Sequence, residues 1–221
     1  LCVKGYRKKS LDLSGAFSAW FVGFVACLAG HSFVWVLFIF FVSSSALTKY
    51  KSKHKEKLEA DFKEGGQRNW LQVFSNGGPA TAIALFYTVR FGNNDIAMDF
   101  RQHNLAAVLH VAYAAHYAAC NGDTWASELG TVLGGTSCRL ITTGRKVPVG
   151  TNGGVSWAGT AATAAGGVVI AATQAMLFLL QGLEYPKEVF LLVAAAGVLG
   201  SVVDSFLGAT LQYSGWCEEK Q

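Results

Sequence analysis

Charged side chains are scarce in this sequence. Asp, Glu, Lys and Arg make up 14% of its 221 residues, and 52% of the residues are hydrophobic. An ordinary soluble domain has about 25% charged residues. This composition argues against a soluble globular enzyme, a disordered chain and a secreted mini-protein.

Several motifs are also absent from the sequence. The five cysteines are widely spaced and form no CxxC pair, so neither a disulfide framework nor a zinc site is indicated. The sequence contains neither GxxxxGK[ST] nor HExxH, which excludes a Walker A loop and the common zinc-protease helix. The net charge of +4 is modest, and it requires no nucleic-acid partner.

The few charges leave long uncharged runs between them. One run has 36 residues, between Asp12 and Lys49, and another has 37, between Lys146 and Glu184. A helix that crosses a lipid bilayer needs about 20 mostly apolar residues. The fold class predicted is therefore all-α, a polytopic helical membrane protein with about five transmembrane helices, the first run forming one span. The spans are expected within residues 16–45, 70–89, 104–120, 155–180 and 189–212.

Residues 1–221 are interpreted as a single integral membrane domain. Because the chain begins at Leu1 and has no signal-peptide pattern, we expect it to be a fragment of a longer protein. Residues 46–69 are expected to form a charged cytosolic loop, in which a solvated surface helix would be ordinary. Residues 121–154 are expected to form a loop that carries polar motifs.

Basic residues predict the orientation. Five spans place the two ends of the chain on opposite faces, with seven Lys and Arg on the N-terminal face and eleven on the other. The positive-inside rule therefore places the second face, with the charged loop, in the cytosol.

Small residues recur every four positions in the last two spans. This spacing lets helix backbones approach closely, so we interpret these residues as helix-packing positions. They are Gly159, Thr163 and Gly167 in one span and Gly197, Ser201 and Ser205 in the other.

Carboxylates are expected on the cytosolic side of the membrane. Asp204 interrupts the last apolar run, and an ionisable residue inside a span indicates a functional site by default. Asp123 and Glu128 follow the third span. Together the three carboxylates can hold Mg²⁺, which takes a few carboxylates and completes its shell with water and phosphate oxygens. The alternative for Asp204 is a buried carboxylate that neighbouring Ser or Asn side chains stabilise.

A glycine-rich stretch precedes the fourth span on the same side. Gly150, Thr151, Asn152, Gly153 and Gly154 lead into a helix, and backbone N–H groups at such a turn suit a phosphate. Arg145 and Lys146 just before it would add positive charge. A flexible turn is the alternative interpretation.

Two further groups of polar residues lie on the helices. Arg68, Gln72 and Asn76 are spaced four apart and share one helix face. His110 and His116 are six apart, and we interpret them as polar residues satisfied between helices.

Six segments together resemble transmembrane protein 19 of animals, and they occur in the order of that family. The resemblance covers nearly the whole chain. The segments are 5–11 (GYRKKSL), 65–70 (GGQRNW), 72–74 (QVF), 122–128 (GDTWASE), 147–154 (VPVGTNGG) and 201–210 (SVVDSFLGAT).

Plant relatives of this family include a phytyl-phosphate kinase, so the resemblance implies a nucleotide-dependent kinase of prenyl monophosphates. Asp123 and Asp204 would be catalytic and, with Glu128, would hold Mg²⁺. Residues 145–146 and 150–154 would bind the phosphates of a nucleoside triphosphate. Arg68, Gln72 and Asn76 would orient the prenyl phosphate, whose tail would lie between the small-residue helices. The expected location is the endoplasmic reticulum or another endomembrane.

Two other functions remain open at this point. An ion-coupled transporter would use Asp204 to bind its coupling ion, and it predicts polar residues through to the opposite face of the membrane. A membrane assembly protein without chemistry predicts that loss of the Asp204 charge affects folding at most.

Overall fold

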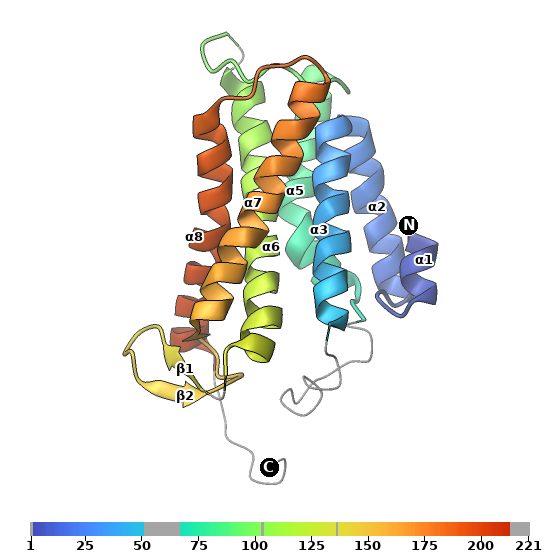
Figure 1. Ribbon diagram of the computed structural model, residues 1–221. Helices are drawn as coiled ribbons and strands as arrows, with labels where there is room; N and C mark the ends of the chain where they lie inside the picture. The colour runs from blue at the N-terminus through green and yellow to red at the C-terminus, as the bar shows by residue number, and fades with distance from the viewer. Residues whose placement is uncertain (1, 51–66, 103, 136, 213–221) are drawn as a thin grey trace.

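The computed structural model describes residues 2–50, 67–102, 104–135 and 137–212. They form a helical bundle with one small sheet (Figure 1). Residues 51–66 of the predicted cytosolic loop lie outside the described residues. The elements are α1 (Cys2–Arg7), α2 (Leu13–Ala29), α3 (His31–Lys49), α5 (Trp70–Phe91), α6 (Asn104–Leu133), β1 (Ser137–Leu140), β2 (Lys146–Pro148), β3 (Gly154–Val155), α7 (Trp157–Leu180) and α8 (Lys187–Leu211).

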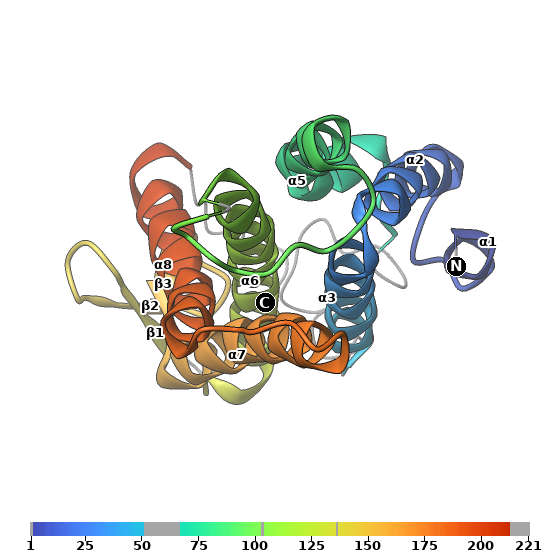
Figure 2. The same cartoon turned by 90° about the horizontal axis from the view of Figure 1, so that it is seen from above.

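The long helices form two groups of three, as Figure 2 shows from above. Helices α6, α7 and α8 pack against one another, α2 packs on α3 and α5, and α3 contacts α6 and α7. By length and composition, α3, α7 and α8 are able to cross a membrane, fewer helices than the five spans predicted. Helix α2 is apolar but has only 17 residues.

The first predicted span is wrong, because it consists of two helices. Helix α2 ends at Ala29 and α3 begins at His31. Gly30 between them has φ +142°, a conformation that other residues rarely adopt. The Asp95 carboxylate then accepts hydrogen bonds from the N–H and hydroxyl of Ser32, at 2.9 and 2.6 Å. A distant carboxylate thus stabilises the N-terminus of α3.

This hairpin places α1 at the end of the bundle that also carries the small sheet, the end of α3 and the start of α5, here called the sheet end (Figure 1). Lys49 Nζ donates to the carbonyl oxygen of Lys8 at 3.0 Å. The backbone N–H of Asp12 donates to the carbonyl oxygen of Arg68 at 3.0 Å. The basic residues at the N-terminus therefore lie on the opposite face from the one predicted.

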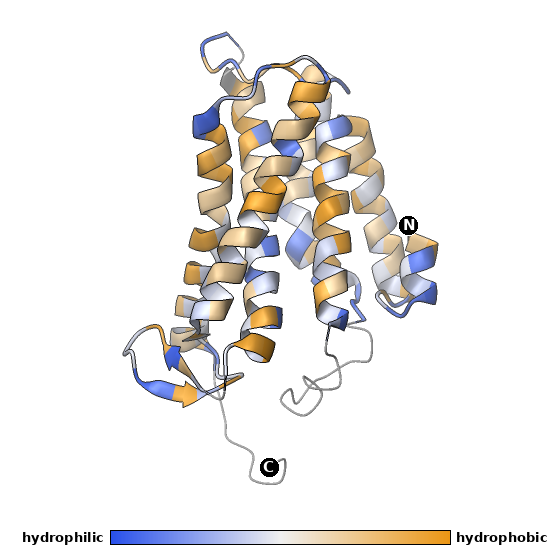
Figure 3. Cartoon of the chain, in the orientation of Figure 1, coloured by the Kyte–Doolittle hydropathy of each residue, from blue (hydrophilic) through white to orange (hydrophobic). Residues whose placement is uncertain are grey.

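Basic residues gather at the sheet end as a result. Figure 3 shows hydrophilic residues there on the sheet and the lower turns of α6, whereas the middle of the bundle is mostly hydrophobic. Of the twelve Lys and Arg among the described residues, three (Arg90, Arg101 and Lys187) lie at the far end. The nine at the sheet end are Lys4, Arg7, Lys8, Lys9, Lys49, Arg68, Arg139, Arg145 and Lys146.

The predicted polar loop 121–154 is also corrected. Helix α6 continues without a break to Leu133, so Gly122, Asp123 and Glu128 are helical. Gly122 resembles a turn residue in the sequence, but it is required for close packing. A Cβ atom on it would lie 2.9 Å from the carbonyl oxygen of Gly197 in α8. After α6, strand β1 pairs antiparallel with β2 and β3, a small sheet that the all-α prediction did not include.

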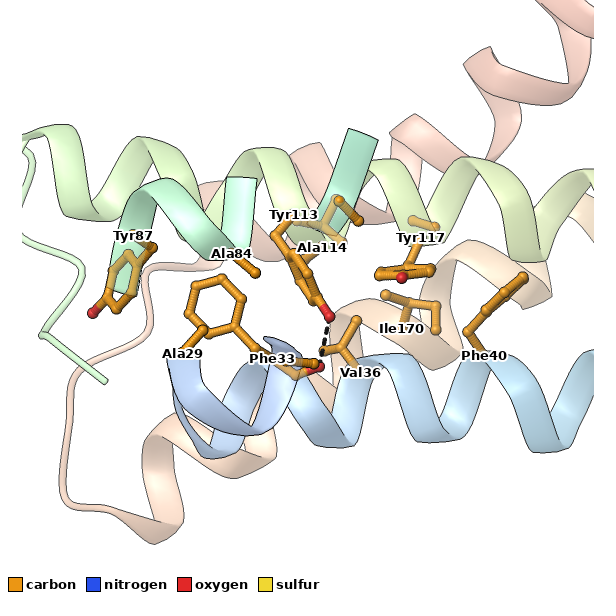
Figure 4. Packing of buried hydrophobic residues seen from close by; sticks show 14 of the residues in the cluster. Ala29, Phe33, Val36, Phe40, Ala84, Tyr87, Tyr113, Ala114, Tyr117 and Ile170 are labelled. Atoms are coloured by element: carbon orange, nitrogen blue, oxygen red, sulfur yellow. Dashed lines mark hydrogen bonds between the residues drawn. The ribbon is translucent and has the colours of Figure 1, made fainter. Parts of the chain in front are cut away.

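The core is a ladder of aromatic and small side chains between the helices. Figure 4 shows it extending from Tyr87 to Phe40. Phe33 packs against Tyr87 and Tyr113, with ring centroids 4.8 and 4.6 Å apart. The Tyr113 hydroxyl donates to the carbonyl oxygen of Phe33 at 2.9 Å. These rings fix α3, α5 and α6 relative to one another.

At the far end the core contains a hydrogen-bonded polar network. His110 Nδ1 lies 3.3 Å from the Ser32 hydroxyl, and its Nε2 lies 3.1 Å from the Tyr87 hydroxyl. The Asp95 carboxylate binds Ser32 and also accepts from Gln181 at 2.8 Å. His110 is thus a buried, satisfied residue between helices, as predicted. His116 similarly contacts the carbonyl oxygen of Asn76 at 2.7 Å.

We expect Gly197→Ala to destabilise the protein. A Cβ atom at this position would lie 2.7 Å from the Cα atom of Gly167, and backbone cannot move aside cheaply. Overpacking of this kind costs about 1–3 kcal/mol. The matched control is Gly23→Ala, because a Cβ atom there meets nothing within 4 Å. Thermal unfolding in detergent should show a lower transition for Gly197→Ala alone, and equal transitions would contradict this packing.

Candidate functional site

A polar cavity of about 470 Å³ lies at the sheet end between α6, α7, α8 and the segment 149–156. It brings together residues that are up to 82 positions apart in sequence, from Asp123 to Ser205. The predicted site residues that line it are Asp123, Glu128, Gly150, Thr151, Asn152, Gly153, Gly154 and Asp204.

Two carboxylates line this cavity, the half-buried Asp123 on α6 and the exposed Asp204 on α8. Asp123 interacts electrostatically with Asp204 and with the Ser201 hydroxyl. Two interacting negative charges repel each other, and a cation bound by both would relieve the repulsion. Ser201 was predicted only as a packing residue. In the sequence, Ser201 lies three residues before Asp204 and on the same helix face, and this spacing indicates a polar role beside Asp204.

Small residues bring these helices together. A Cβ atom on Gly166 of α7 would lie 3.0 Å from the Cα atom of Gly122 in α6. The buried Asn121 next to it donates to the carbonyl oxygen of Gly166 at 2.9 Å and accepts from the Ser43 hydroxyl of α3 at 2.9 Å. Asn121 therefore joins three helices two residues before Asp123. The packing roles predicted for Gly167 and Gly197 are confirmed, because a Cβ atom on Gly197 would lie 2.7 Å from the Cα atom of Gly167.

The glycine-rich segment lies directly on α8. Gly153 has φ +75°, and a Cβ atom on it would clash with the Cβ atom of Ala209 and lie 2.7 Å from the carbonyl oxygen of Ser205. On its other side the Gly153 carbonyl oxygen accepts from the N–H of Ile141 at 2.9 Å. The segment is therefore held between the sheet and the turn that follows Asp204.

The N-terminus of α7 also opens on the polar cavity. Ser156 is its N-cap and accepts from the N–H of Gly159 at 3.1 Å. Ser156, Gly159 and Thr160 all line the cavity. A helix N-terminus carries partial positive charge and attracts anions, so this wall of the cavity favours a phosphate and the α6–α8 wall favours a cation.

The structure does not bring all the predicted residues together. Arg145 and Lys146 are exposed on the β1–β2 hairpin and do not line the cavity. The described residues contain no group of three or more His, Cys, Asp or Glu side chains that could hold a metal ion. Glu128 is five residues after Asp123, about 140° further around the helix. The predicted three-carboxylate cluster is therefore reduced to the Asp123–Asp204 pair.

The predicted substrate-orienting residues line a different hollow. Arg68, Gln72 and Asn76 lie at one end of an apolar groove of about 360 Å³ between α2, α3 and α5. Burial lowers the pKa of Arg68, and the nearby Glu128 carboxylate partly opposes this shift. Glu128 lines the polar cavity and not the apolar groove, so this interaction is an electrostatic link between residues of the two hollows. The helices rich in small residues pack backbone to backbone, which argues against the predicted position of the prenyl tail between them.

Long apolar helices, a core between them and a polar cavity at one end are the features of a multi-pass integral membrane protein. The chain belongs to the family described as integral membrane protein DUF92, whose model matches residues 1–221. The predicted membrane character is thus confirmed.

Similar proteins occur in plants and bacteria. Protein PGR of Arabidopsis thaliana is 41% identical over 227 residues, which cover 98% of this chain and 77% of that protein. An uncharacterized membrane protein of Synechocystis is 32% identical, over 93% of this chain and 73% of its own length. Protein VTE6, chloroplastic, of A. thaliana is 26% identical, over 91% of this chain and 56% of its own length.

No solved structure matches the chain. The resemblance to transmembrane protein 19 stays a prediction.

We expect Gly153→Ala to displace the glycine-rich segment from α8. Gly144→Ala is the matched control, because Gly144 also has positive φ (+67°) but has nothing within 4 Å of a Cβ atom. Both variants are strained in the backbone, but only Gly153→Ala clashes with α8. Its extra cost should be about 1–3 kcal/mol, measured by thermal unfolding, with faster proteolysis of the β1–β2 hairpin. Equal effects of the two variants would contradict the docking of this segment.

Proposed function

We propose that this protein is a magnesium- and nucleotide-dependent kinase of prenyl monophosphates. The observation that carries the proposal is the Asp123–Asp204 pair, which faces a glycine-rich segment and a helix N-terminus across one polar cavity. Phosphoryl transfer needs a metal, positive charge and positioning more than covalent chemistry by the protein. The cavity offers a place for each of these.

Separate groups of residues would bind the metal and the nucleotide. Asp123 and Asp204 would hold Mg²⁺, which supplies charge neutralisation when bound and completes its shell with water and phosphate oxygens. N–H groups of residues 150–154 and of the first turn of α7 would hold the phosphates of a nucleoside triphosphate. We assign no role to Arg145 and Lys146, because both lie outside the cavity.

In the reaction, an oxygen of the prenyl monophosphate attacks the γ-phosphorus of the nucleotide. A P–O bond forms to the acceptor, the bond to the β-phosphate oxygen breaks, and the nucleoside diphosphate leaves. Arg68, with Gln72 and Asn76, would orient the acceptor from the other side of α6. The electrostatic interaction of Arg68 with Glu128 supports this role, because Glu128 lines the polar cavity.

The relationship to plant proteins supports the proposal. The resemblance in sequence implied a family with a phytyl-phosphate kinase among its plant relatives, and two plant proteins are similar over more than nine-tenths of this chain. We extend that chemistry to this protein because the two acidic residues and the glycine-rich segment converge. Neither plant protein carries an activity in its name.

We also propose an orientation in the membrane. Helices α2 and α5 would cross beside the three most apolar helices, and α6 would do so with its polar C-terminal turns at the sheet end. Nine of the twelve described basic residues lie at that end, so the positive-inside rule places the polar cavity on the cytosolic face. The endoplasmic reticulum or another endomembrane remains our proposed location.

A transporter is the second candidate, favoured by one observation. The far end contains a buried polar network around His110 and Asp95, and a transporter requires polar residues at that face. His110 precedes Asp123 by thirteen residues, about 20 Å along α6. Between these positions α6 carries Tyr113, Ala114 and Tyr117 of the buried hydrophobic core (Figure 4), which favours a site at one face over a path through the bundle.

We expect Mg²⁺ to raise the thermal stability of the wild-type protein but not that of Asp204→Asn. A ligand at 100 times its Kd stabilises by about 2.7 kcal/mol. Without Mg²⁺, Asp204→Asn should be at least as stable as wild type, because it removes repulsion with Asp123. Glu184→Gln, an exposed acidic residue at the far end, serves as the control. An equal Mg²⁺ shift in all three proteins would refute the metal site.

The kinase reaction can be measured directly. Purified full-length protein with Mg²⁺, a nucleoside triphosphate and geranylgeranyl or phytyl monophosphate should form the diphosphate. Asp123→Asn and Asp204→Asn should each reduce kcat by at least about 100-fold, in the range of losing a group that stabilises transition-state charge. Glu184→Gln should leave kcat unchanged. If the wild-type protein yields no diphosphate with ATP, CTP, GTP or UTP, the kinase proposal is wrong.

A further inference from the structure

The apolar groove between α2, α3 and α5 is built differently from the polar cavity. Its walls are mostly aromatic and aliphatic side chains, and its deep side is closed by the buried residues Val22 and Phe40. Trp20 and Phe24 line the same groove but are 59% and 49% exposed. Because these two residues lie on an apolar helix, the groove opens sideways, toward the lipid, rather than into water.

One end of the groove is polar and carries positive charge. Arg68, Gln72 and Asn76 lie there, and none of the described residues that line the groove is acidic. Two oxygen acceptors at this end already have hydrogen-bond partners. Gln72 Oε1 accepts from the N–H of Asn69, and the backbone carbonyl oxygen of Asn76 contacts the His116 ring. The guanidinium of Arg68 is a donor only. An anion therefore fits this end better than a cation does.

A buried hydroxyl also faces the groove. The Tyr117 side chain is fully buried and lines the groove, and its hydroxyl has no hydrogen-bond partner among the residues that the structure describes. The neighbouring Tyr113 donates its proton to the carbonyl oxygen of Phe33 instead. Figure 4 shows Tyr117 beside Phe40 at this end of the core. Buried polar atoms without a partner are rare and call for an explanation.

We infer that the groove binds a lipid with one apolar chain and a phosphate headgroup, with the phosphate at Arg68 and the chain along α2 toward Phe24. The inference rests on the proposed function, because this lipid would be the phosphate acceptor of that reaction. A volume of about 360 Å³ is in the range of pockets that hold one small ligand. Charge selects the headgroup, and the aromatic walls together with the sideways opening select a chain that enters from the bilayer.

The position of Arg68 explains how a lipid in this groove can meet a nucleotide in the polar cavity. Arg68 and Glu128 interact electrostatically, and Glu128 lines the polar cavity. The headgroup end of the groove is thus linked electrostatically to the polar cavity through Glu128, on the C-terminal turns of α6. The lipid chain and the nucleotide remain on opposite sides of this helix.

Direct binding tests the inference without catalysis. The probe is geranylgeranyl monophosphate, titrated into the detergent-solubilised protein without nucleotide or Mg²⁺ and followed by tryptophan fluorescence. Gly23 lines the groove and has nothing within 4 Å of a Cβ atom, so Gly23→Leu fills the groove without disturbing the packing. We expect its affinity to fall at least tenfold. The matched control is Ala165→Leu on the exposed face of α7, which should bind as wild type does.

The headgroup is tested in the same way. Arg68→Gln should lower the affinity for geranylgeranyl monophosphate about tenfold and bring it close to that for geranylgeraniol, which lacks the phosphate. Arg139→Gln, an exposed residue of the sheet, should leave both affinities unchanged. Oleate and the two-chain lipid phosphatidic acid are the competitors. If oleate binds as tightly, the phosphate assignment is wrong, and if phosphatidic acid does, the single-chain assignment is wrong.

The two proposals fail separately. If the lipid phosphate binds and Gly23→Leu weakens binding, but the wild-type protein forms no diphosphate, the kinase proposal is refuted and the lipid site stands. If diphosphate forms and Gly23→Leu changes neither the Kd nor the KM for the lipid, the groove is not the acceptor site. A loss of affinity equal in Gly23→Leu and Ala165→Leu would likewise overturn the groove, because it would indicate a general defect.

Discussion

Backbone contact between α6, α7 and α8 is the constraint on which the rest of the structure depends. Lipid tails are as apolar as leucine, so helices in a membrane gain little from hydrophobic burial and associate through close packing. Gly122, Gly166 and Gly197 remove the side chains that would hold the three backbones apart. Asp123 directly follows Gly122, and Asp204 lies on the same helix as Gly197, about two turns further along. The packing that stabilises the bundle therefore also brings two like charges together, which is unfavourable unless a ligand compensates.

The break at Gly30 is the second feature that determines the arrangement of the helices. It turns one uncharged run into two antiparallel helices, so the basic N-terminus returns to the sheet end. It also creates the surfaces of α2 and α3 that form the walls of the apolar groove with α5. A single long helix would have provided neither. Because Asp95 binds the first turn of α3 from a distant loop, this hairpin depends on a contact far apart in sequence.

Charge counting located most of the helices and most of the candidate site, because membrane helices are long and their interruptions are few. Helices α5, α7 and α8 lie where the uncharged runs predicted, and Asp123, Asp204 and residues 150–154 line one cavity. Two features carry no charge that would mark them in the sequence. Gly30 reverses the chain inside an uncharged run, and Gly122 resembles a turn although it serves packing. That the Tyr117 hydroxyl is buried without a hydrogen-bond partner among the described residues could not be predicted either, because some of its neighbours come from other helices.

Helix α6 separates the polar cavity from the apolar groove. Its 30 residues span about 45 Å, whereas the hydrocarbon core of a bilayer is about 30 Å thick. In the orientation proposed above, its last turns extend beyond the apolar region at the sheet end. On this part of α6, Asp123 interacts with Asp204 of α8, and Glu128 interacts with Arg68. A water-soluble nucleotide and a lipid chain need opposite surroundings, and one helix with two polar faces at the membrane boundary can provide both while keeping their phosphates close.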